Sequence, residues 1–130
     1  MHIFFHYFQN FMGAHNEFGK LGEEMAANYL IENGYSIRYR NYRYLKAEID
    51  ILAQKGDMLA VVEVKSRSSD YLQEIAETVN KKKMGLLVSA ADHYVIENDL
   101  DVEVRFDIIT ILKRGQQYQL EHLEDAFFHF

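Results

Sequence analysis

The chain has 130 residues and a formal net charge of −6, with 48% hydrophobic and 26% charged residues, a composition typical of a single globular domain. It contains no cysteine, which excludes disulfides, iron–sulfur clusters, thiolate zinc sites and cysteine nucleophiles. No stretch reaches the roughly 18 apolar residues that a membrane helix needs, so we expect a cytoplasmic protein with no membrane partner. Because the chain is acidic, any nucleic-acid site must be a local basic patch.

The first eleven residues are rich in aromatic side chains and contain no lysine or arginine, so they do not resemble a secretory signal. We expect residues 1–14 to be an N-terminal extension outside the core and residues 15–130 to form one domain. A helix over about 17–33 is predicted next. Asn16 can cap its start, Gly34 can end it, and the apolar residues between them follow helical spacing.

The rest of the chain alternates strand and helix patterns. Strands are predicted over 35–44, 47–54 and 58–65, followed by a polar loop over 66–70. A helix is predicted over 81–97, then a strand over 102–112, with room for an extra C-terminal strand over 118–123. The order α-β-β-β-α-β defines an α/β domain whose mixed β-sheet is flanked by helices.

Charged residues gather in two neighbouring strands. Glu48 and Asp50 are two residues apart in one strand, as are Glu63 and Lys65 in the next, and residues two apart share a face. Gly56-Asp57 suits a two-residue hairpin turn, because glycine can adopt positive φ at the first central position. Counting outward from that turn pairs Asp50 with Glu63 and Glu48 with Lys65, so two carboxylates are expected to lie opposite each other.

Two opposed carboxylates repel each other unless something compensates them. One of them can take a raised pKa, or a cation can lie between them. Oxygen ligands of this kind suit Mg²⁺ or Mn²⁺. The alternative is an exposed strand face whose charges are solvated. The apolar residues of the same strands are expected to cover the opposite face together; these are Ile49, Ile51, Val62 and Val64.

Two helical residues are candidates to join this group. Glu23 shares its helix face with small residues, which would let the helix approach the sheet, whereas Glu24 lies on a polar stripe and is read as facing solvent. In the second helix, Lys83 lies on the side of Leu87 and Tyr94 and could reach an anion. The alternatives are a partly buried structural glutamate at Glu23, and a solvated helix start at Lys83 that opposes the helix dipole.

A basic segment follows the first helix, with tyrosines between its cations. Cations alternating with aromatic rings are what a nucleic-acid backbone and unstacked bases require. The alternative is an edge strand that its charges protect from aggregation. The candidate nucleic-acid-binding residues are Arg38, Arg40, Arg43, Lys46, Arg67 and Lys83.

These motifs together resemble the YraN-like family of bacterial proteins. The resemblance runs from about His15 to Phe128 and rests on Gly22-Glu23, Gly34-Tyr35, Asn41-Tyr42-Arg43, Glu48-Ile49-Asp50, Glu63-Val64-Lys65 with Arg67, Lys83, Arg105-Phe106-Asp107 and Ala126-Phe127. One departure is Ala47, where the family usually has glycine. The family is similar to the restriction-endonuclease-like superfamily and to archaeal Holliday-junction resolvases.

The resemblance implies a PD-(D/E)XK site. Asp50 would be its first acid, Glu63 and Lys65 its E-x-K pair, and Glu23 an acid contributed by the first helix. The implied metal ligands are the carboxylates of Asp50, Glu63 and Glu23, with the carbonyl of Val64. The implied cofactor is Mg²⁺ or Mn²⁺.

The sequence therefore favours a metal-dependent nuclease that hydrolyses DNA phosphodiesters, with branched or single-stranded DNA as the expected partner. A non-catalytic nucleic-acid-binding or adaptor protein that keeps the nuclease fold is the alternative. A third reading is an interaction domain whose contact is the aromatic stretch 127–130. The oligomeric state is left open, with a homodimer among the options.

Overall fold

The computed structural model describes residues 15–68 and 81–126. Their helices and strands are, in chain order, α2 (His15–Glu32), β1 (Ser36–Tyr44), β2 (Ala47–Lys55), β3 (Met58–Ser68), α4 (Lys81–Glu97), β4 (Glu103–Arg114) and β5 (Gln117–Leu123). The strands form one sheet in the order β1-β2-β3-β4-β5. This confirms the predicted α/β class with a mixed sheet flanked by helices, and it confirms the extra C-terminal strand.

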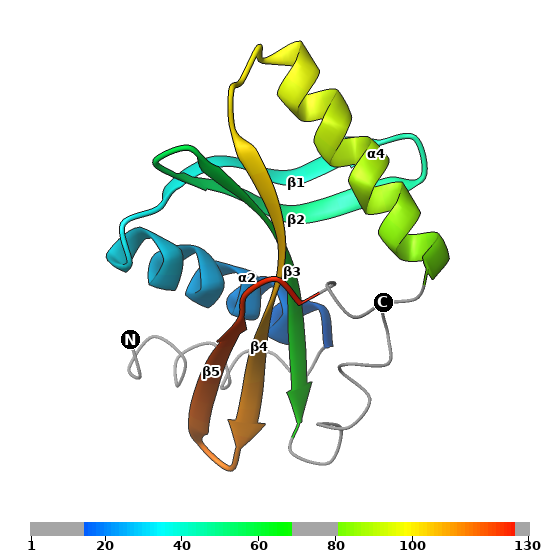
Figure 1. Cartoon of the computed structure of the whole chain (residues 1–130). Helices are drawn as coiled ribbons and strands as arrows, with labels where there is room; N and C mark the ends of the chain where they lie inside the picture. The colour runs from blue at the N-terminus through cyan, green and yellow to red at the C-terminus, as the bar shows by residue number, and fades with distance from the viewer. Residues whose placement is uncertain (1–14, 69–80, 127–130) are drawn as a thin grey trace.

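Three short hairpins and one crossover connection that contains α4 build the sheet. The β1–β2, β2–β3 and β4–β5 pairs are antiparallel, whereas β3 and β4 are parallel. A parallel pair needs a long connection, and α4 lies within that connection. The two helices lie on opposite faces of the sheet (Figure 1). Of the parts of the chain that the structure describes, no helix is long and apolar enough to cross a membrane.

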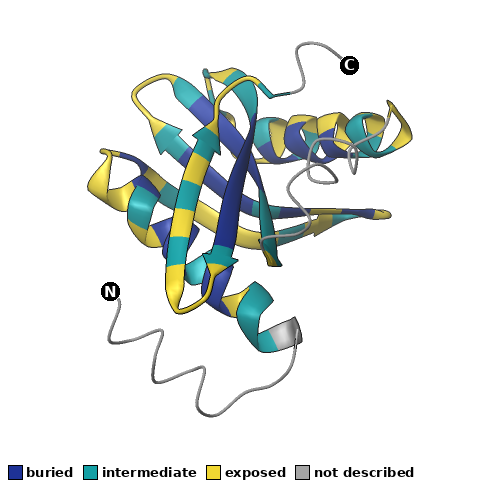
Figure 2. Ribbon diagram, turned by 90° about the horizontal axis from the view of Figure 1, so that it is seen from below, coloured by how far each residue is buried: buried dark blue, intermediate teal, exposed yellow. Residues whose placement is uncertain are grey.

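Each face of the sheet has its own apolar cluster. β4 carries a continuous buried run and lies inside the sheet, while β5 alternates between exposed and half-buried residues at its edge (Figure 2). The cluster under α2 contains Leu21, Met25, Ala26, Ala27, Leu30, Tyr35, Ile51, Ala53, Ala60, Val62, Ile109 and Ile111. The cluster under α4 contains Ala47, Ile49, Leu52, Leu59, Val61, Leu87, Ala90, Ala91, Tyr94 and Ile108.

The predicted loop over 66–70 is wrong in its first part. β3 continues to Ser68 because its parallel pairing with β4 runs without interruption as far as Ser68 and Lys113. The backbone bonds to β4 therefore override the polar character of this segment. The expected extension over 1–14 and the aromatic contact over 127–130 lie outside the described residues.

A buried ionic network fixes the far end of the sheet. Asp107 is fully buried, and the Arg105 guanidinium donates to both of its oxygens at 2.8 Å. His122 Nε2 lies 2.7 Å from the same carboxylate, and its Nδ1 lies 3.0 Å from the Tyr29 hydroxyl of α2. Burial opposes ionisation of Asp107, but the hydrogen bonds from His122 and Arg105 prevail and lower its pKa. The network thus joins α2 to β4 and β5.

Helix α2 lies very close to β3 at Gly22. A Cβ atom added at Gly22 would overlap Ser66 Oγ and come within 3.3 Å of Ser66 Cβ. The Ser66 hydroxyl is itself buried and has no hydrogen-bond partner among the described residues. The next residue of the helix is Glu23, so this close approach sets how near its carboxylate comes to the sheet.

We expect Gly22→Ala to lower the free energy of unfolding by about 1–3 kcal/mol, as overpacking of a tight contact does. Ser66→Ala should be neutral or stabilising, because it removes an unpaired buried hydroxyl, and it should recover part of the loss in the double variant. Gly19→Ala is the matched control. A Cβ atom there meets nothing within 4 Å, so helix propensity alone should stabilise it by about 0.5–1 kcal/mol. Urea unfolding followed by circular dichroism measures all four variants. Stabilisation by Gly22→Ala equal to that of Gly19→Ala would contradict the close approach.

Candidate functional site

The hairpin between β2 and β3 has the predicted register, but its pairing stops early. Gly56 adopts φ +61°, and the pairs run from Lys55 and Met58 outward to Ile51 and Val62. Hydrogen-bonded pairs alternate along antiparallel strands, so the next N–H to pair would be that of Val64. This N–H instead donates to Asp50 Oδ2 at 2.7 Å. A side chain therefore takes the place of a backbone acceptor, and the ladder ends there.

The neighbouring strand is irregular at the same level. The β1–β2 pairing passes from Arg40 and Ile51 to Tyr42 and Ile49 without including Asn41 and Asp50. Asn41 has φ 55°, a left-handed conformation that asparagine tolerates better than most residues. Beyond this point β3 turns away from the β1–β2 hairpin (Figure 1). At Asp50 the sheet is thus opened on the β3 side and locally irregular on the β1 side.

The opening reverses the facing of β2. Ile49 packs in the cluster under α4, whereas Ile51 packs in the cluster under α2 with Val62. The expectation that Ile49 and Ile51 share a face is therefore wrong, because strand alternation is interrupted between them. It follows that Glu48 lies on the α2 side of the sheet. Glu48 pairs with Arg43 at 2.9 Å and does not face Lys65.

The E-x-K pair lies on the α4 side of β3. Glu63 is buried, and its Oε1 accepts Lys83 Nζ at 2.8 Å and Lys65 Nζ at 3.1 Å. Lys83 comes from the first turn of α4, so this helix supplies the second cation. Burial opposes protonation of Lys83, but its hydrogen bond to Glu63, together with the negative charges of Glu63 and Asp50, outweighs burial and raises its pKa. Burial lowers the pKa of Lys65, against the charge of Glu63.

Glu23 lies on helix α2, on the face of the sheet opposite to Glu63 and Lys65. It is half-buried on α2, and burial raises the pKa of its carboxyl group. The charge of Arg40 lowers this pKa, whereas the charges of Glu48 and Glu63 raise it. Glu23 therefore lies within electrostatic reach of Glu63 through the opened part of the sheet. Glu24, predicted to face solvent, is half-exposed and forms an ion pair with Arg40 at 2.9 Å.

The carboxyl group of Asp50 is costly to ionise in the folded protein. Burial raises the pKa of its carboxyl group to about 7, and the charges of Glu63 and Glu23 add to the rise. The hydrogen bond from Val64 and the charge of Lys65 act in the opposite direction without cancelling it. The site thus holds a carboxylate whose ionised form lacks sufficient positive charge nearby.

Of the ligands implied by the resemblance, Asp50 contacts the Val64 N–H, while Glu63 and Glu23 are near enough to raise the pKa of Asp50. The N–H and carbonyl of one strand residue point in the same direction, so the Val64 carbonyl is directed toward the side of Asp50. Within residues 15–68 and 81–126, no three acidic or histidine side chains are close enough to hold a metal ion by themselves. A cation here would be held by fewer carboxylates, together with the carbonyl and water.

The structure divides the predicted basic segment between the two faces of the sheet. Arg40 and Arg43 pair with acids on the α2 side. Arg38 instead donates from Nε to the Tyr94 hydroxyl of α4 at 3.2 Å. Lys46 is exposed in the β1–β2 turn. Arg67 is half-buried on β3 and donates to the Ser66 carbonyl at 2.8 Å. The six candidate cations therefore do not form one continuous patch.

Sequence patterns did not reveal the aromatic groove that Tyr94 and His93 form with β1. Its two sides are some fifty residues apart in the chain, as the 2.6 Å contact between the Tyr42 hydroxyl and His93 Nδ1 shows. Periodicity correctly predicts that Tyr94 faces inward, but it does not indicate which strand residues it meets.

Fold and site together define a small α/β protein with a cluster of acids and lysines at a break in its sheet. The family model described as "Uncharacterised protein family UPF0102" matches residues 22–111, and the chain belongs to this family. The predicted YraN-like membership is thereby confirmed.

Curated relatives from several bacteria are similar over nearly the whole chain. A UPF0102 protein of Flavobacterium psychrophilum is 49% identical over 119 residues, covering 92% of this chain and all of the relative. One from Christiangramia forsetii is 50% identical with the same coverage. One from Phocaeicola vulgatus is 44% identical over 117 residues, covering 90% of this chain and 97% of the relative.

We expect the stability of the protein to fall as pH rises from about 4 to 8. The pKa of Asp50 is about 7 in the folded state and 3.8 ordinarily, so the folded protein holds a proton that the unfolded chain releases within this window. At about 1.4 kcal/mol per pKa unit, the loss of unfolding free energy reaches about 4 kcal/mol. Asp50→Asn keeps an oxygen for the Val64 N–H and should flatten the profile.

Urea unfolding at pH 4, 6 and 8 measures the effect. Asp50→Asn should be the more stable protein at pH 8. Glu48→Gln is the control, because Glu48 is exposed, and it should keep the wild-type slope. Identical slopes for wild type and Asp50→Asn would show that Asp50 ionises without cost.

Proposed function

We propose that this protein is a divalent-metal-dependent nuclease that hydrolyses phosphodiester bonds in DNA. The observation that carries the proposal is the position of Asp50. Its carboxylate lies at the break between β2 and β3, bound to the N–H of Val64, next to the Glu63–Lys65 pair. A carboxylate that is costly to ionise and lies beside a lysine and further acids is typical of a functional site.

The residues at the opening fit Mg²⁺ or Mn²⁺ by donor type. Mg²⁺ is commonly held by one or two carboxylates, with water and substrate phosphate completing its shell. Asp50, Glu63 and the Val64 carbonyl supply oxygen ligands, and the raised pKa of Asp50 indicates that added positive charge would be favourable here. When bound, such a cation would neutralise the scissile phosphate and lower the pKa of a bound water.

The other residues would have separate tasks. Lys65 would hold the attacking water or stabilise the charge that develops on the phosphate. Lys83 would orient Glu63, whose Oε1 it contacts at 2.8 Å, and would attract the phosphate backbone. Glu23, on the opposite face, would orient water or a second cation. The exposed Arg43 would contribute to DNA affinity through a phosphate.

Addition of Mg²⁺ or Mn²⁺ should raise the melting temperature of the protein at pH 8. A ligand that binds only the folded state stabilises it, and a cation also relieves the repulsion at Asp50. Glu63→Ala should abolish this rise, whereas Glu48→Gln should keep it. The measurement is a thermal melt with millimolar Mn²⁺ or with chelator. A wild-type melting temperature that does not respond to Mn²⁺ would rule out the metal site.

Lys65→Ala should lower the rate of cleavage far more than it lowers the affinity for DNA. Loss of an electrostatic group acting in the transition state costs on the order of a hundredfold in rate, whereas loss of one phosphate contact reduces the salt dependence of binding by about one unit. Arg43→Ala should do the reverse, weakening binding with little change in the rate of bound substrate.

Single-turnover cleavage at saturating protein, with binding titrations at several salt concentrations, separates the two effects. Linear, flapped and four-way DNA should be compared, with Asp50→Ala as the inactive control. Equal losses of rate and affinity in both variants would remove the catalytic role of Lys65. Binding without cleavage, across substrates and metals, would replace the nuclease by the non-catalytic adaptor.

A further inference from the structure

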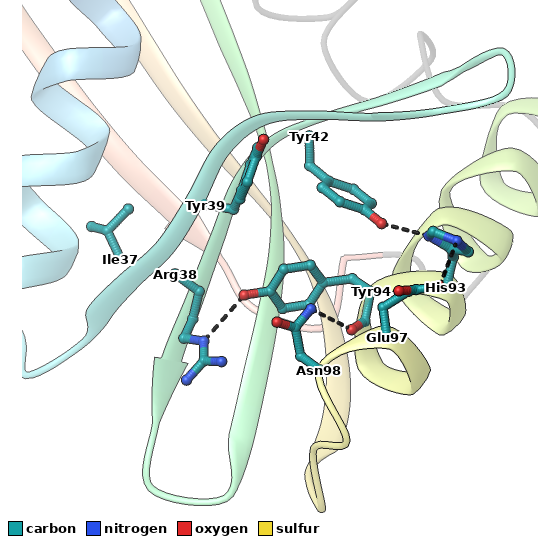
Figure 3. Close-up of a pocket in the computed structure, with 8 residues that line it drawn as sticks. All are labelled: Ile37, Arg38, Tyr39, Tyr42, His93, Tyr94, Glu97 and Asn98. Carbon is teal, nitrogen blue, oxygen red and sulfur yellow. Dashed lines mark hydrogen bonds and ion pairs between the residues drawn. The ribbon is translucent and has the colours of Figure 1, made fainter.

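A groove of about 630 Å³ lies between β1 and the C-terminal half of α4 (Figure 3). Tyr94 follows Lys83 by three helical turns, which places the groove roughly 16 Å along α4 from the residue that contacts Glu63. Both lie on the α4 side of the sheet. The groove is lined by Ile37, Arg38, Tyr39, Tyr42, His93, Tyr94, Glu97 and Asn98.

Two irregularities of β1 direct its side chains into this groove. The register shifts between Ile37 and Tyr39, so Arg38 is an extra residue in the strand. Ile37 packs under α2, yet Arg38 and Tyr39 both contact Tyr94 of α4. A bulge re-aims side chains in this way and is often found next to functional sites. The left-handed Asn41, further along β1, then lets Tyr42 face the same side.

The aromatic rings hold one another in place. Tyr42 meets Tyr94 edge to face with ring centroids 5.2 Å apart, and Tyr39 meets Tyr42 in the same manner at 5.3 Å. The Tyr42 hydroxyl is further fixed by His93 Nδ1. Despite these contacts Tyr39 remains 50% exposed. A rigid ring with half of its surface open to solvent is suited to stacking against a planar ligand.

The groove carries a positive charge at one end and hydrogen-bond acceptors elsewhere. At one end, Arg38 donates from Nε to the Tyr94 hydroxyl, and its guanidinium carbon lies 6.0 Å from the centre of that ring (Figure 3). Glu97 and Asn98 also line the groove. The Glu97 carboxylate lies 3.6 Å from His93 Nε2, and the Asn98 amide donates to the Tyr94 carbonyl, which leaves the Asn98 side-chain oxygen as an acceptor. A ligand with an anionic group at the Arg38 end and hydrogen-bond donors near Glu97 and Asn98 matches this arrangement. A nucleobase with its phosphate has these groups.

We propose that the groove binds an unpaired nucleobase of single-stranded DNA, with its phosphate at Arg38 and its face against Tyr39. This deepens the nuclease proposal and rests on it for the placement of the scissile bond, since the strand would run along α4 to Glu63. Roughly 16 Å corresponds to about five nucleotides at the 3.4 Å spacing of stacked bases. A duplex keeps its base faces covered, so the groove selects unpaired strands.

The test uses fluorescence anisotropy with a labelled eight-nucleotide single strand and a duplex of equal length, both bound to the uncleaving Asp50→Asn protein. Tyr39→Leu, made in that background, keeps apolar volume but loses the ring. It should weaken single-strand binding about tenfold and leave duplex binding unchanged. Tyr39→Phe should bind as well as the parent. Circular dichroism melts verify that each variant is folded.

A second comparison does not depend on the folding of Tyr39→Leu. Arg38→Ala should weaken single-strand binding and reduce its salt slope by about one. Arg114→Ala removes the same charge from the distant β4–β5 hairpin, where the side chain is exposed, and should have little effect. Equal effects of the two arginine variants, or equal effects of Tyr39→Leu on single strand and duplex, would overturn the proposal.

Two further outcomes separate this inference from the nuclease proposal. Binding of single strands that depends on Tyr39, without cleavage by the wild type under any metal, supports the groove and removes the nuclease. Metal-dependent cleavage that is indifferent to Tyr39 and Arg38 removes the groove and keeps the nuclease. Competition by adenosine monophosphate as strong as that of the eight-nucleotide strand would assign the groove to a free nucleotide and overturn the strand assignment.

Discussion

The hydrogen bond from the Val64 N–H to the Asp50 carboxylate is the contact on which the arrangement of the candidate site depends. It replaces a backbone bond of the β2–β3 ladder, so the strands can separate without leaving that N–H unpaired, which would be costly in a buried sheet. The separation allows acids from opposite sides of the sheet to interact. Glu23 on α2 and Glu63 on the α4 side both raise the pKa of Asp50. In an uninterrupted sheet the backbone would lie between them.

The charges at the opening are unevenly balanced. Glu63 is buried, and the ammonium groups of Lys65 and Lys83 both contact one of its oxygens. Such pairing allows a buried carboxylate to remain charged. Asp50 is stabilised by the backbone N–H of Val64 and by the charges of Lys65 and Lys83, but burial and two further acids outweigh them. The unmet requirement for positive charge is therefore concentrated on Asp50, which is why a divalent cation is the natural complement in the proposed function. The Asp107 network at the far end of the sheet is closed by contrast, because Arg105 and His122 satisfy its carboxylate.

The irregularities of β1 decide how one basic and aromatic segment is used. In a regular strand alternate residues would share a face, and its arginines and tyrosines would be mixed on both sides of the sheet. The bulge at Arg38 and the left-handed Asn41 sort them instead. Arg40 and Arg43 pair with acids on the α2 side, while Tyr39 and Tyr42 meet Tyr94 on the α4 side. The α4 helix thus connects two features on one side of the sheet, the Lys83–Glu63 pair near its start and the tyrosine groove near its end.

The sequence by itself determined the element order, the inward faces of both helices and the register of the β2–β3 hairpin. These depend on short-range rules, namely helix periodicity, the conformation of Gly56 and the counting of residues outward from a two-residue turn. It also singled out Asp50, Glu63 and Lys65 as candidate site residues, because their spacing in two adjacent strands is visible along the chain. Only the tertiary structure decided that Asp50 binds Val64 instead of facing Glu63 in the ladder, and that Ile49 and Ile51 face opposite sides. Such choices depend on competition between a side-chain and a backbone acceptor and on packing against helices distant in sequence, which local pattern does not encode.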